Sequence, residues 1–345
     1  MKGFEKKRGL WLFMLLVLCL GLTFLYIGCS SDDTVTTDNN NGNNNTVAKW
    51  SVTPQTSGIT ETSLFKVFVE PVSGKMWVVG DKGVILTSSD KGTTWTKQDS
   101  GGEAALQSVF FVNDSEGWIA GDGGAVLHTK DGGGKWEKQN SGVTEKLRSA
   151  FFSNNTTGWA VGDAGKIIGT KDGGVAWAAQ TSSTNQQLNS IYFAKPKPGE
   201  VVMNKGWAVG LGGTIVHTDN AGGVWTKQIS KIPDPLYGMY FDSETRGWAV
   251  GKSGTVLTTT DGGITWNQSA SAAAQGKTLY DVSFLNAATG IVAGSGGKII
   301  FTTDGKTWEA IESNTTKVLW SVAFLNANEA WAVGDSGTIL YIKKL

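Results

Sequence analysis

The sequence predicts an all-β protein, a seven-bladed β-propeller with four antiparallel strands in each blade. The first observation behind this prediction is a repeat, because a W-A-V-G motif or a close variant occurs seven times at intervals of 40 to 48 residues. The second is that each interval contains four short segments of strand composition, separated by glycine-rich turns. The third is that the two ends of the array complement each other. Four strands at a period near 40 residues are typical of a propeller.

Each unit begins with a segment of the form L-x-x-V-x-F, as at 106–111, 188–193 and 319–324. Apolar residues fall on both faces of this segment, as expected for a strand that lies between neighbouring sheets. The second strand carries the W-A-V-G motif, and a glycine turn leads from it into the third strand. The second-strand motifs start at Trp77, Trp118, Trp159, Trp207, Trp248, Ile291 and Trp331.

The third and fourth strands are joined by the motif S/T-x-D-x-G-x-x-W, which resembles the Asp-box of bacterial neuraminidase-type repeats. The Asp carboxylate is expected to accept N–H bonds across its own turn, while the Trp fills the gap between sheets. In the fourth copy an Asn replaces the Asp, keeping an acceptor oxygen without the charge, which fits a structural role better than acid catalysis. The predicted structural residues are Asp90, Asp131, Asp172, Asn220, Asp261 and Asp304.

The ends of the array predict how the ring closes. The last unit starts at Leu319, supplies three strands and stops at Leu345 before any Asp-box. A single strand-like segment at Trp50 precedes the first unit. We therefore expect the N-terminal strand to complete the C-terminal blade, so that residues 49–345 form a closed ring with no free sheet edge. A monomer is the expected state.

Residues 1–28 have the form of a lipoprotein signal peptide, with Lys and Arg residues before an apolar run from Leu10 to Ile27. The run ends in L-Y-I-G-C, which resembles the bacterial lipobox and implies lipidation of Cys29. Because the run approaches the length of a membrane span, an uncleaved signal anchor is the alternative. The Asn-rich residues 29–48 are too polar to form a core and are expected to be a disordered tether.

These features predict an exported protein of the cell envelope that is attached to a membrane through a lipid anchor. The serine after Cys29 favours the outer membrane or the cell surface over the inner membrane. Without the leader, 26 basic and 29 acidic residues remain, a net charge of about −3. This balance gives no indication of nucleic-acid binding.

The combined pattern F-x-x-x-x-x-G-W-A-V-G-x-x-G-x-I-x-x-T-x-D-G-G-x-T-W, over about residues 49–345, resembles the photosystem II assembly and stability factor family. The resemblance implies a seven-bladed propeller that binds partner proteins without catalysis. The photosynthetic members of that family bind their partners through an arginine-rich patch. This chain has only Arg148 and Arg246 after the leader, so the patch is not matched. The fold and a binding role are therefore implied more strongly than the photosynthetic role.

Two kinds of glycoside-cleaving enzyme are the alternatives to a binding protein. A sialidase needs three arginines around the substrate carboxylate, and two cannot supply them. A glycosidase with two carboxylates remains open, because loops that lead into first strands carry acidic residues. These candidates are Glu61, Glu103, Glu145, Asp234, Asp281 and Glu312.

No cofactor or metal site is expected. His128 and His217 occupy the same repeat position in blades two and four, too far apart around a seven-fold ring to share a metal. We expect them to be ordinary structural histidines. No phosphate loop is present, because the glycine-rich turns belong to hairpins.

The second position of each first strand varies from blade to blade, whereas the packing positions keep their type. In a propeller the start of the innermost strand lies at the mouth of the central channel, on the face opposite the Asp-box turns. We expect this channel mouth to be a partner-binding surface with an aromatic arc opposite an arginine. The alternative is that these side chains only pack beneath the loops. The channel mouth consists of Phe65, Gln107, Arg148, Asn189, Tyr237, Tyr280 and Trp320.

Blade four contains a basic insertion at 194–206, which is either a tolerated surface loop or a contact with a partner or lipid headgroup. Taken together, the sequence predicts a non-catalytic, lipid-anchored scaffold or assembly factor. The expected partner is a membrane or envelope protein complex. The alternative function is a surface protein that binds a glycan or cleaves glycosides.

Overall fold

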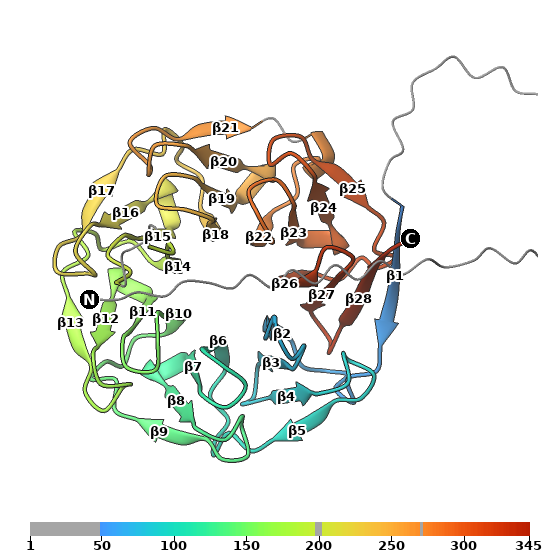
Figure 1. The fold of residues 1–345 in the computed structure, drawn as a ribbon, viewed down its shortest axis with the longest axis horizontal. Coiled ribbons are helices and arrows are strands. Elements are labelled where there is room, and N and C mark those ends of the chain that lie inside the picture. Colours follow the sequence, from blue (N-terminus) through green and yellow to red (C-terminus); the bar gives the residue numbers. More distant parts are fainter. Residues whose placement is uncertain (1–48, 197–201, 270–271) are drawn as a thin grey trace, which may run out of the picture. The chain divides into compact units, whose positions relative to one another are not determined.

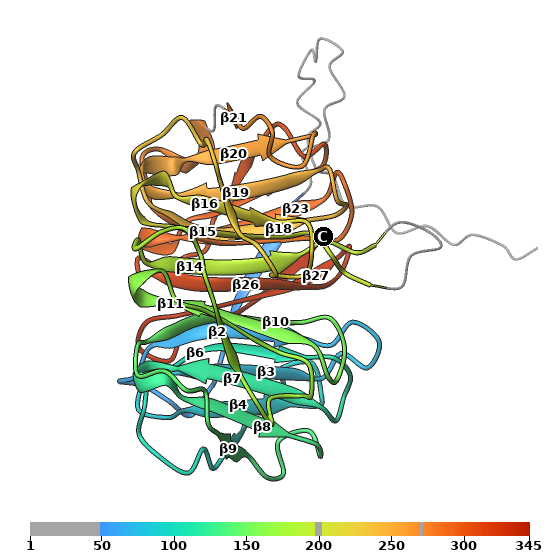
Figure 2. The same cartoon turned by 90° about the vertical axis from the view of Figure 1, so that its left-hand side faces the viewer.

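Seven four-stranded antiparallel sheets surround a central opening, so the predicted seven-bladed propeller is confirmed (Figure 1). The computed structural model describes residues 49–196, 202–269 and 272–345. The proposed signal peptide, tether and Cys29 lie outside these residues. Within them, no helix is long and apolar enough to cross a membrane. Figure 2 shows the sheets from the side, with their connecting loops at two opposite faces.

Each blade runs outward from the channel in four strands. The innermost strands are β2 (Leu64–Val69), β6 (Leu106–Phe111), β10 (Leu147–Phe152), β14 (Leu188–Phe193), β18 (Leu236–Phe241), β22 (Leu279–Phe284) and β26 (Leu319–Asn326). The second strands are β3 (Met76–Gly80), β7 (Gly117–Gly121), β11 (Gly158–Gly162), β15 (Gly206–Gly210), β19 (Gly247–Gly251), β23 (Gly290–Gly294) and β27 (Glu329–Gly334).

The third strand of each blade is largely buried, and the outermost strand is the most exposed. The third strands are β4 (Ile85–Ser88), β8 (Val126–Thr129), β12 (Ile167–Thr170), β16 (Ile215–Thr218), β20 (Val256–Thr259), β24 (Ile299–Thr302) and β28 (Ile339–Lys344). The outermost strands are β5 (Thr96–Gln98), β9 (Glu137–Gln139), β13 (Ala178–Gln180), β17 (Thr226–Gln228), β21 (Asn267–Ser269), β25 (Glu309–Ile311) and β1 (Trp50–Gln55).

Short 3-10 turns lie on several connections. They are η1 (Asp122–Gly124), η2 (Asp163–Gly165), η3 (Leu211–Gly213), η4 (Lys252–Gly254), η5 (Ala272–Ala274) and η6 (Ser295–Gly297). All but η5 join a second strand to a third strand, at the end of the blade where the innermost strand begins.

The ring closes through the predicted pairing of the two chain ends. Strand β1 pairs antiparallel with β28, from Trp50 opposite Lys344 to Gln55 opposite Ile339. Trp50 also packs edge-on against Phe301 of blade six at 4.7 Å between ring centroids. Blade seven therefore takes its outermost strand from the beginning of the propeller and its other three from the end.

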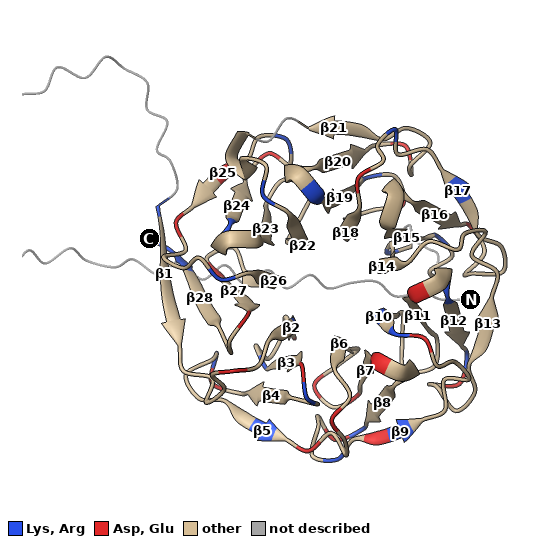
Figure 3. Cartoon of the chain, turned by 180° about the vertical axis from the view of Figure 1, so that it is seen from behind, with Lys and Arg blue, Asp and Glu red and all other residues tan. Residues whose placement is uncertain are grey.

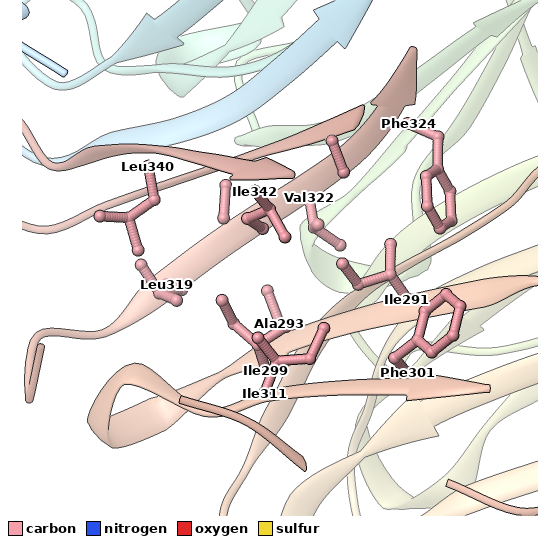
Figure 4. Close-up of a cluster of buried hydrophobic side chains, with 12 residues drawn as sticks. Ile291, Ala293, Ile299, Phe301, Ile311, Leu319, Val322, Phe324, Leu340 and Ile342 are labelled. Carbon is pink, nitrogen blue, oxygen red and sulfur yellow. The ribbon is translucent and has the colours of Figure 1, made fainter. Parts of the chain in front are cut away.

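The hydrophobic core is divided into seven clusters, each between two adjacent blades. Figure 4 shows the cluster between blades six and seven, where Ile291 and Phe301 face Val322 and Phe324. The buried residues of the innermost strands are mainly the first, fourth and sixth, so both faces of the sheet are covered as predicted. The second, third and fifth residues are left to line the channel.

Candidate functional site

A β-bulge lies at the second residue of every innermost strand. In blade three, Leu147 pairs with Gly162 and Ser149 with Val161, so Arg148 has no residue opposite it. The same register shift occurs in the other six blades. Bulges turn a side chain out of the regular alternation of a strand. The bulge thus presents one side chain per blade at the start of the innermost strand.

The glycine that ends the W-A-V-G motif helps to form this bulge. A Cβ atom on Gly162 would clash with the backbone carbonyl oxygen of Lys146, just before the innermost strand. The next residue, Asp163, donates its backbone N–H to the same carbonyl at 2.9 Å. A side chain at the glycine would separate the two strands, and the bulged residue would no longer be held in place.

All seven residues of the predicted channel mouth line one cavity of about 300 Å³. The cavity lies at the start of the innermost strands, on the face away from the Asp-box turns. Lys146 and Gln187 also line it, and sequence reasoning missed both. The available signal was their position directly before the first Leu of the strand, which brings them to the same rim.

Four of these residues form a continuous aromatic arc. Tyr237 and Tyr280 lie 5.2 Å apart between ring centroids, and Tyr280 lies 4.4 Å from Trp320. Trp320 in turn meets Phe65 edge-on at 6.1 Å. The Trp320 indole N–H donates to Asp335 Oδ1 at 2.7 Å, which fixes the orientation of the ring. The arc therefore spans blades five, six, seven and one.

The other part of the mouth is polar. Arg148 Nε donates to Asp163 Oδ1 at 2.6 Å, and Gln107 donates to Asp122 at 3.0 Å. Lys146 pairs with the other oxygen of Asp122 at 2.9 Å, linking blades two and three. These two aspartates begin the acidic turns η1 and η2 (Figure 3). The Arg148 side chain is only 27% exposed, so its guanidinium is held at the cavity wall.

The tyrosines of the arc are neutral at physiological pH. Burial raises the pKa of Tyr237, and the neighbouring Arg148 only partly opposes this effect. Burial also raises the pKa of Tyr280, helped by Tyr237 and Asp335. The mouth thus combines neutral aromatic rings that carry hydroxyl groups with an arginine. This combination is suited to recognising a peptide or another ligand with apolar and polar parts.

The Asp-box residues lie on the turns at the other face and close those turns. In blade two, Asp131 Oδ1 accepts the Thr129 hydroxyl at 2.8 Å and the backbone N–H of Lys135 at 2.9 Å. Asn220 Oδ1 accepts the corresponding bonds from Thr218 and from the N–H of Val224, both at 2.9 Å. The neutral amide therefore makes the same two bonds as Asp131 and Asp172. The carboxylates of blades one, five and six accept one further bond, from a Thr hydroxyl to Oδ2.

Tryptophans from two motifs meet around one Phe in five of the gaps between blades. Trp159 stacks on Phe193 of the next blade at 3.7 Å, and Trp225 meets the same ring edge-on at 6.0 Å. The Trp159 indole N–H donates to the carbonyl oxygen of Ala221 in the Asp-box of the next blade at 3.1 Å. The same arrangement recurs between other blades. The W-A-V-G and Asp-box motifs are thus parts of one inter-blade contact.

The two histidines pack against these tryptophans. His128 stacks on Trp118 at 4.6 Å, and its Nε2 lies 3.2 Å from Glu116. His217 packs on Trp207 in the same position. Burial lowers the pKa of both imidazoles. Among the described residues, no group of three or more His, Cys, Asp or Glu side chains is placed to hold a metal ion.

One of the candidate carboxylates was assigned to the wrong element. Asp281 lies within strand β22, not on the loop before it, and it is only 8% exposed. The bulge at Tyr280 turns Asp281 toward the channel. There it forms an ion pair with Lys66 at 2.7 Å. The mouth cavity is lined by none of the six candidates, which are Glu61, Glu103, Glu145, Asp234, Asp281 and Glu312.

The insertion of blade four is described only in part, since residues 197–201 lie outside the described structure. It connects β14 to β15 at the Asp-box end of the blade, as expected. Lys205 lies 3.7 Å from Asp219 and 3.8 Å from Glu244. This lysine therefore faces acidic groups of its own protein.

Comparisons with known proteins agree with the fold. No curated protein matches the sequence. Among solved structures, YCF48 bound to a D1 peptide is 20% identical, with a TM-score of 0.68 over 86% of this chain and 95% of the other. YCF48 from Cyanidioschyzon merolae is also 20% identical, with a TM-score of 0.69 over 86% and 99% of the two chains.

Enzymes share the fold as well. An inactive variant of virginiamycin B lyase from Staphylococcus aureus, solved with quinupristin, is 14% identical with a TM-score of 0.70 over 86% and 100% of the two chains. At such identities the likeness concerns the fold alone. A sequence model described as Photosynthesis system II assembly factor YCF48 matches residues 43–148, 135–235 and 227–303. These matches cover most of the propeller, and the chain belongs to the YCF48 photosystem II assembly factor family.

Proposed function

We propose that this chain is a non-catalytic scaffold that binds a partner protein at the channel mouth and assists the assembly or stability of a membrane protein complex in the cell envelope. The observation that carries the proposal is the aromatic arc opposite Arg148, built from positions at which the seven blades differ. Tyr, Trp and Arg are the residues that contribute most to protein interfaces. The structure of YCF48 with a D1 peptide supports a peptide segment as the occupant.

The proposal includes attachment to the membrane through lipidated Cys29, because an anchored propeller would meet membrane proteins at the surface where they are assembled. Substitution Cys29→Ser tests this part by itself. The variant should move from the membrane fraction to the soluble fraction after cell lysis. Retention in the membrane fraction would favour an uncleaved signal anchor instead.

Affinity purification from solubilised membranes of the native cell tests partner binding. The wild-type chain should retain a protein in near-stoichiometric amount. Trp320→Ala should reduce its recovery about tenfold or more, because it removes the centre of the arc. Ile264→Ala is the matched control, since Ile264 is 81% exposed on an Asp-box turn away from the mouth. Both variants must keep the thermal stability of a folded propeller.

Two results would contradict the proposal. One is the absence of a stoichiometric protein partner, or full recovery of that partner by folded Trp320→Ala protein. The other is turnover on a panel of glycans that is abolished by changing a loop carboxylate such as Glu145. The second result would establish the glycosidase alternative.

A further inference from the structure

A second cavity occupies the channel toward the Asp-box face. Its volume is about 560 Å³, and its lining includes residues at the ends of the innermost strands, such as Glu70, Pro71 and Leu325. None of the seven channel-mouth residues lines it. We call it the channel cavity. Its size falls within the range of small-molecule sites, roughly 300 to 1,000 Å³.

Five aromatic side chains form one wall of the channel cavity. Each is the fifth residue of its innermost strand, and neighbouring ring centroids lie 5.0 to 5.4 Å apart. This aromatic wall consists of Phe68, Phe110, Phe151, Tyr192 and Tyr240. At such distances each ring meets the next in a tilted contact, the arrangement that aromatic pairs prefer.

The wall is interrupted at two blades. Blades six and seven carry Ser283 and Ala323 at the same fifth position, and both residues line the cavity. A full circle would have rings there, so the small side chains leave ring-sized space between Tyr240 and Phe68. On one side of this gap Phe284 stacks on Tyr240 at 5.6 Å between ring centroids, and on the other side lies Phe68. Phe284 and Phe68 both line the cavity and are the aromatic partners for a planar group.

A cation is available beside this space. Lys66 lines the cavity, its side chain is 34% exposed, and its one hydrogen bond among the described residues goes to Asp281. Both oxygens of Asp281 have further donors, because Oδ2 also accepts the Ser321 hydroxyl at 2.6 Å and the Val322 N–H at 3.2 Å, and Oδ1 accepts the Val282 N–H at 3.1 Å. An ammonium group has three donors, so Lys66 can bind a second anion without losing the first.

We propose that the channel cavity binds a small planar aromatic molecule that carries a carboxylate. Its ring would occupy the space above Ser283 and Ala323 and complete the circle begun by the aromatic wall. Its carboxylate would accept a charge-assisted hydrogen bond from Lys66, and such bonds are stronger than those between neutral groups. This site is separate from the channel mouth and does not depend on the proposed partner binding.

Calorimetric titration of the full chain with 2-naphthoate tests the proposal. Saturable binding with a stoichiometry of one is expected. Ala323→Phe should weaken it at least tenfold, because the new ring fills the gap. The variant should fold, since blades one to three already carry Phe at this position. Ser283→Phe is a second filling variant in case Ala323→Phe does not fold.

Two controls locate the site and the charge. Trp320→Ala, at the mouth, should leave naphthoate binding unchanged. The uncharged probe 2-naphthylmethanol should bind at least tenfold more weakly than naphthoate, because it cannot pair with Lys66. The proposal is overturned by the absence of saturable binding at millimolar naphthoate, or by unchanged binding in a folded filling variant. It is also overturned if Trp320→Ala loses naphthoate binding while the filling variants keep it. Equal affinity for 2-naphthoate and 2-naphthylmethanol would overturn it as well.

Discussion

Two sets of side chains project from the same seven innermost strands, and they follow opposite rules. The residues that face neighbouring blades repeat: a Phe at the sixth position stacks under a Trp of the previous blade in gap after gap. The residues at the second position, which face the channel mouth, all differ except for two tyrosines. The repeated residues are therefore those that each blade needs for packing. The residues that vary lie at the channel mouth, where the side chains can suit one particular partner.

The third and fifth positions lie between these extremes. Ser is the usual third residue, and it accepts a backbone N–H from the next blade, as Ser108 does from Ala150 at 3.1 Å. Three residues depart from this pattern: Gly238, which has no side chain, and Lys66 and Asp281, which pair with each other. The aromatic wall likewise ends at Ser283 and Ala323. Comparing the repeats thus shows which residues are exceptions, and the charged pair and the gap in the aromatic wall both line the channel cavity.

The largest effect on stability is expected from the repeated contact. Trp159 is 2% exposed, and Trp159→Ala removes the stack on Phe193 and the bond to Ala221. We expect the free energy of unfolding to fall by about 3–5 kcal/mol, because a large cavity remains between blades. Chemical denaturation measures this. A loss similar to that of Trp320→Ala would remove the distinction between the two sets of residues.

The ion pair in the channel should have an intermediate effect. Asp281→Ser restores the usual third residue but leaves Lys66 without its partner, so we expect a loss of about 1–3 kcal/mol. The double variant Lys66→Ser/Asp281→Ser should lose less than Asp281→Ser alone. Comparing the unfolding free energies of the single and double variants isolates the pair. Strictly additive losses would show that the two charges are not coupled.

The channel mouth should contribute little to stability. Trp320→Ala removes one indole hydrogen bond and two aromatic contacts at a partly exposed site, so we expect a loss of about 1 kcal/mol. The same denaturation experiment measures it. Global unfolding of this variant would mean that the mouth residues act as packing residues beneath the loops.

The smallest effect at neutral pH is expected from the Asp-box carboxylates. Asp90→Asn should leave the melting temperature at pH 7 nearly unchanged. The Asn keeps the Oδ1 bonds that Asn220 makes in blade four, and its Nδ2–H can donate to the Thr94 hydroxyl oxygen in place of the bond that Oδ2 now accepts. The acid range should differ. Hydrogen bonds from Thr94, through its hydroxyl and its backbone N–H, lower the pKa of Asp90 to about 2.

A lowered folded-state pKa stabilises the protein above the unfolded pKa of about 3.9, and this stabilisation is lost as the pH falls through the folded pKa. Melting temperatures of the wild type should therefore fall between about pH 4 and pH 2. Asp90→Asn should show a shallower decline over the same range. If the melting temperatures of the two proteins changed identically with pH, the pKa of the Asp90 carboxylate would be the same in the folded and unfolded states.

The period and the ends of the array were enough to predict the number of blades, the strand order within each blade and the closure of the ring. They also predicted which side chains meet at the channel mouth, because one position per repeat lies at one place on a ring. The bulge was not predicted, because the glycine that permits it was assigned only to a hairpin turn, whereas its close contact is with the Lys146 carbonyl of the neighbouring strand. Asp281 falls inside the L-x-x-V-x-F pattern of 279–284, so the sequence already contained the signal that places it in the strand rather than in a loop.

The contact between Lys66 and Asp281 could not be predicted from the sequence either. The two residues are 215 positions apart and come from different blades, with blade seven between them. Comparison of equivalent positions shows both as exceptions but does not show that they meet. The aromatic wall was similarly overlooked, because apolar residues on both faces of the strand were assigned to contacts between sheets. The bulge turns the fifth residue to the channel instead.

Closure of the ring through β1 and β28 has a consequence for the order of folding. Six blades are built from contiguous stretches of chain, whose hairpins can form as soon as about 40 residues are present. The seventh requires Trp50 to find Lys344, a search over nearly the whole propeller. Contacts of such long sequence separation form late and slowly. The last step should therefore be the docking of β1, and until then both β1 and the outer edge of β28 are unpaired.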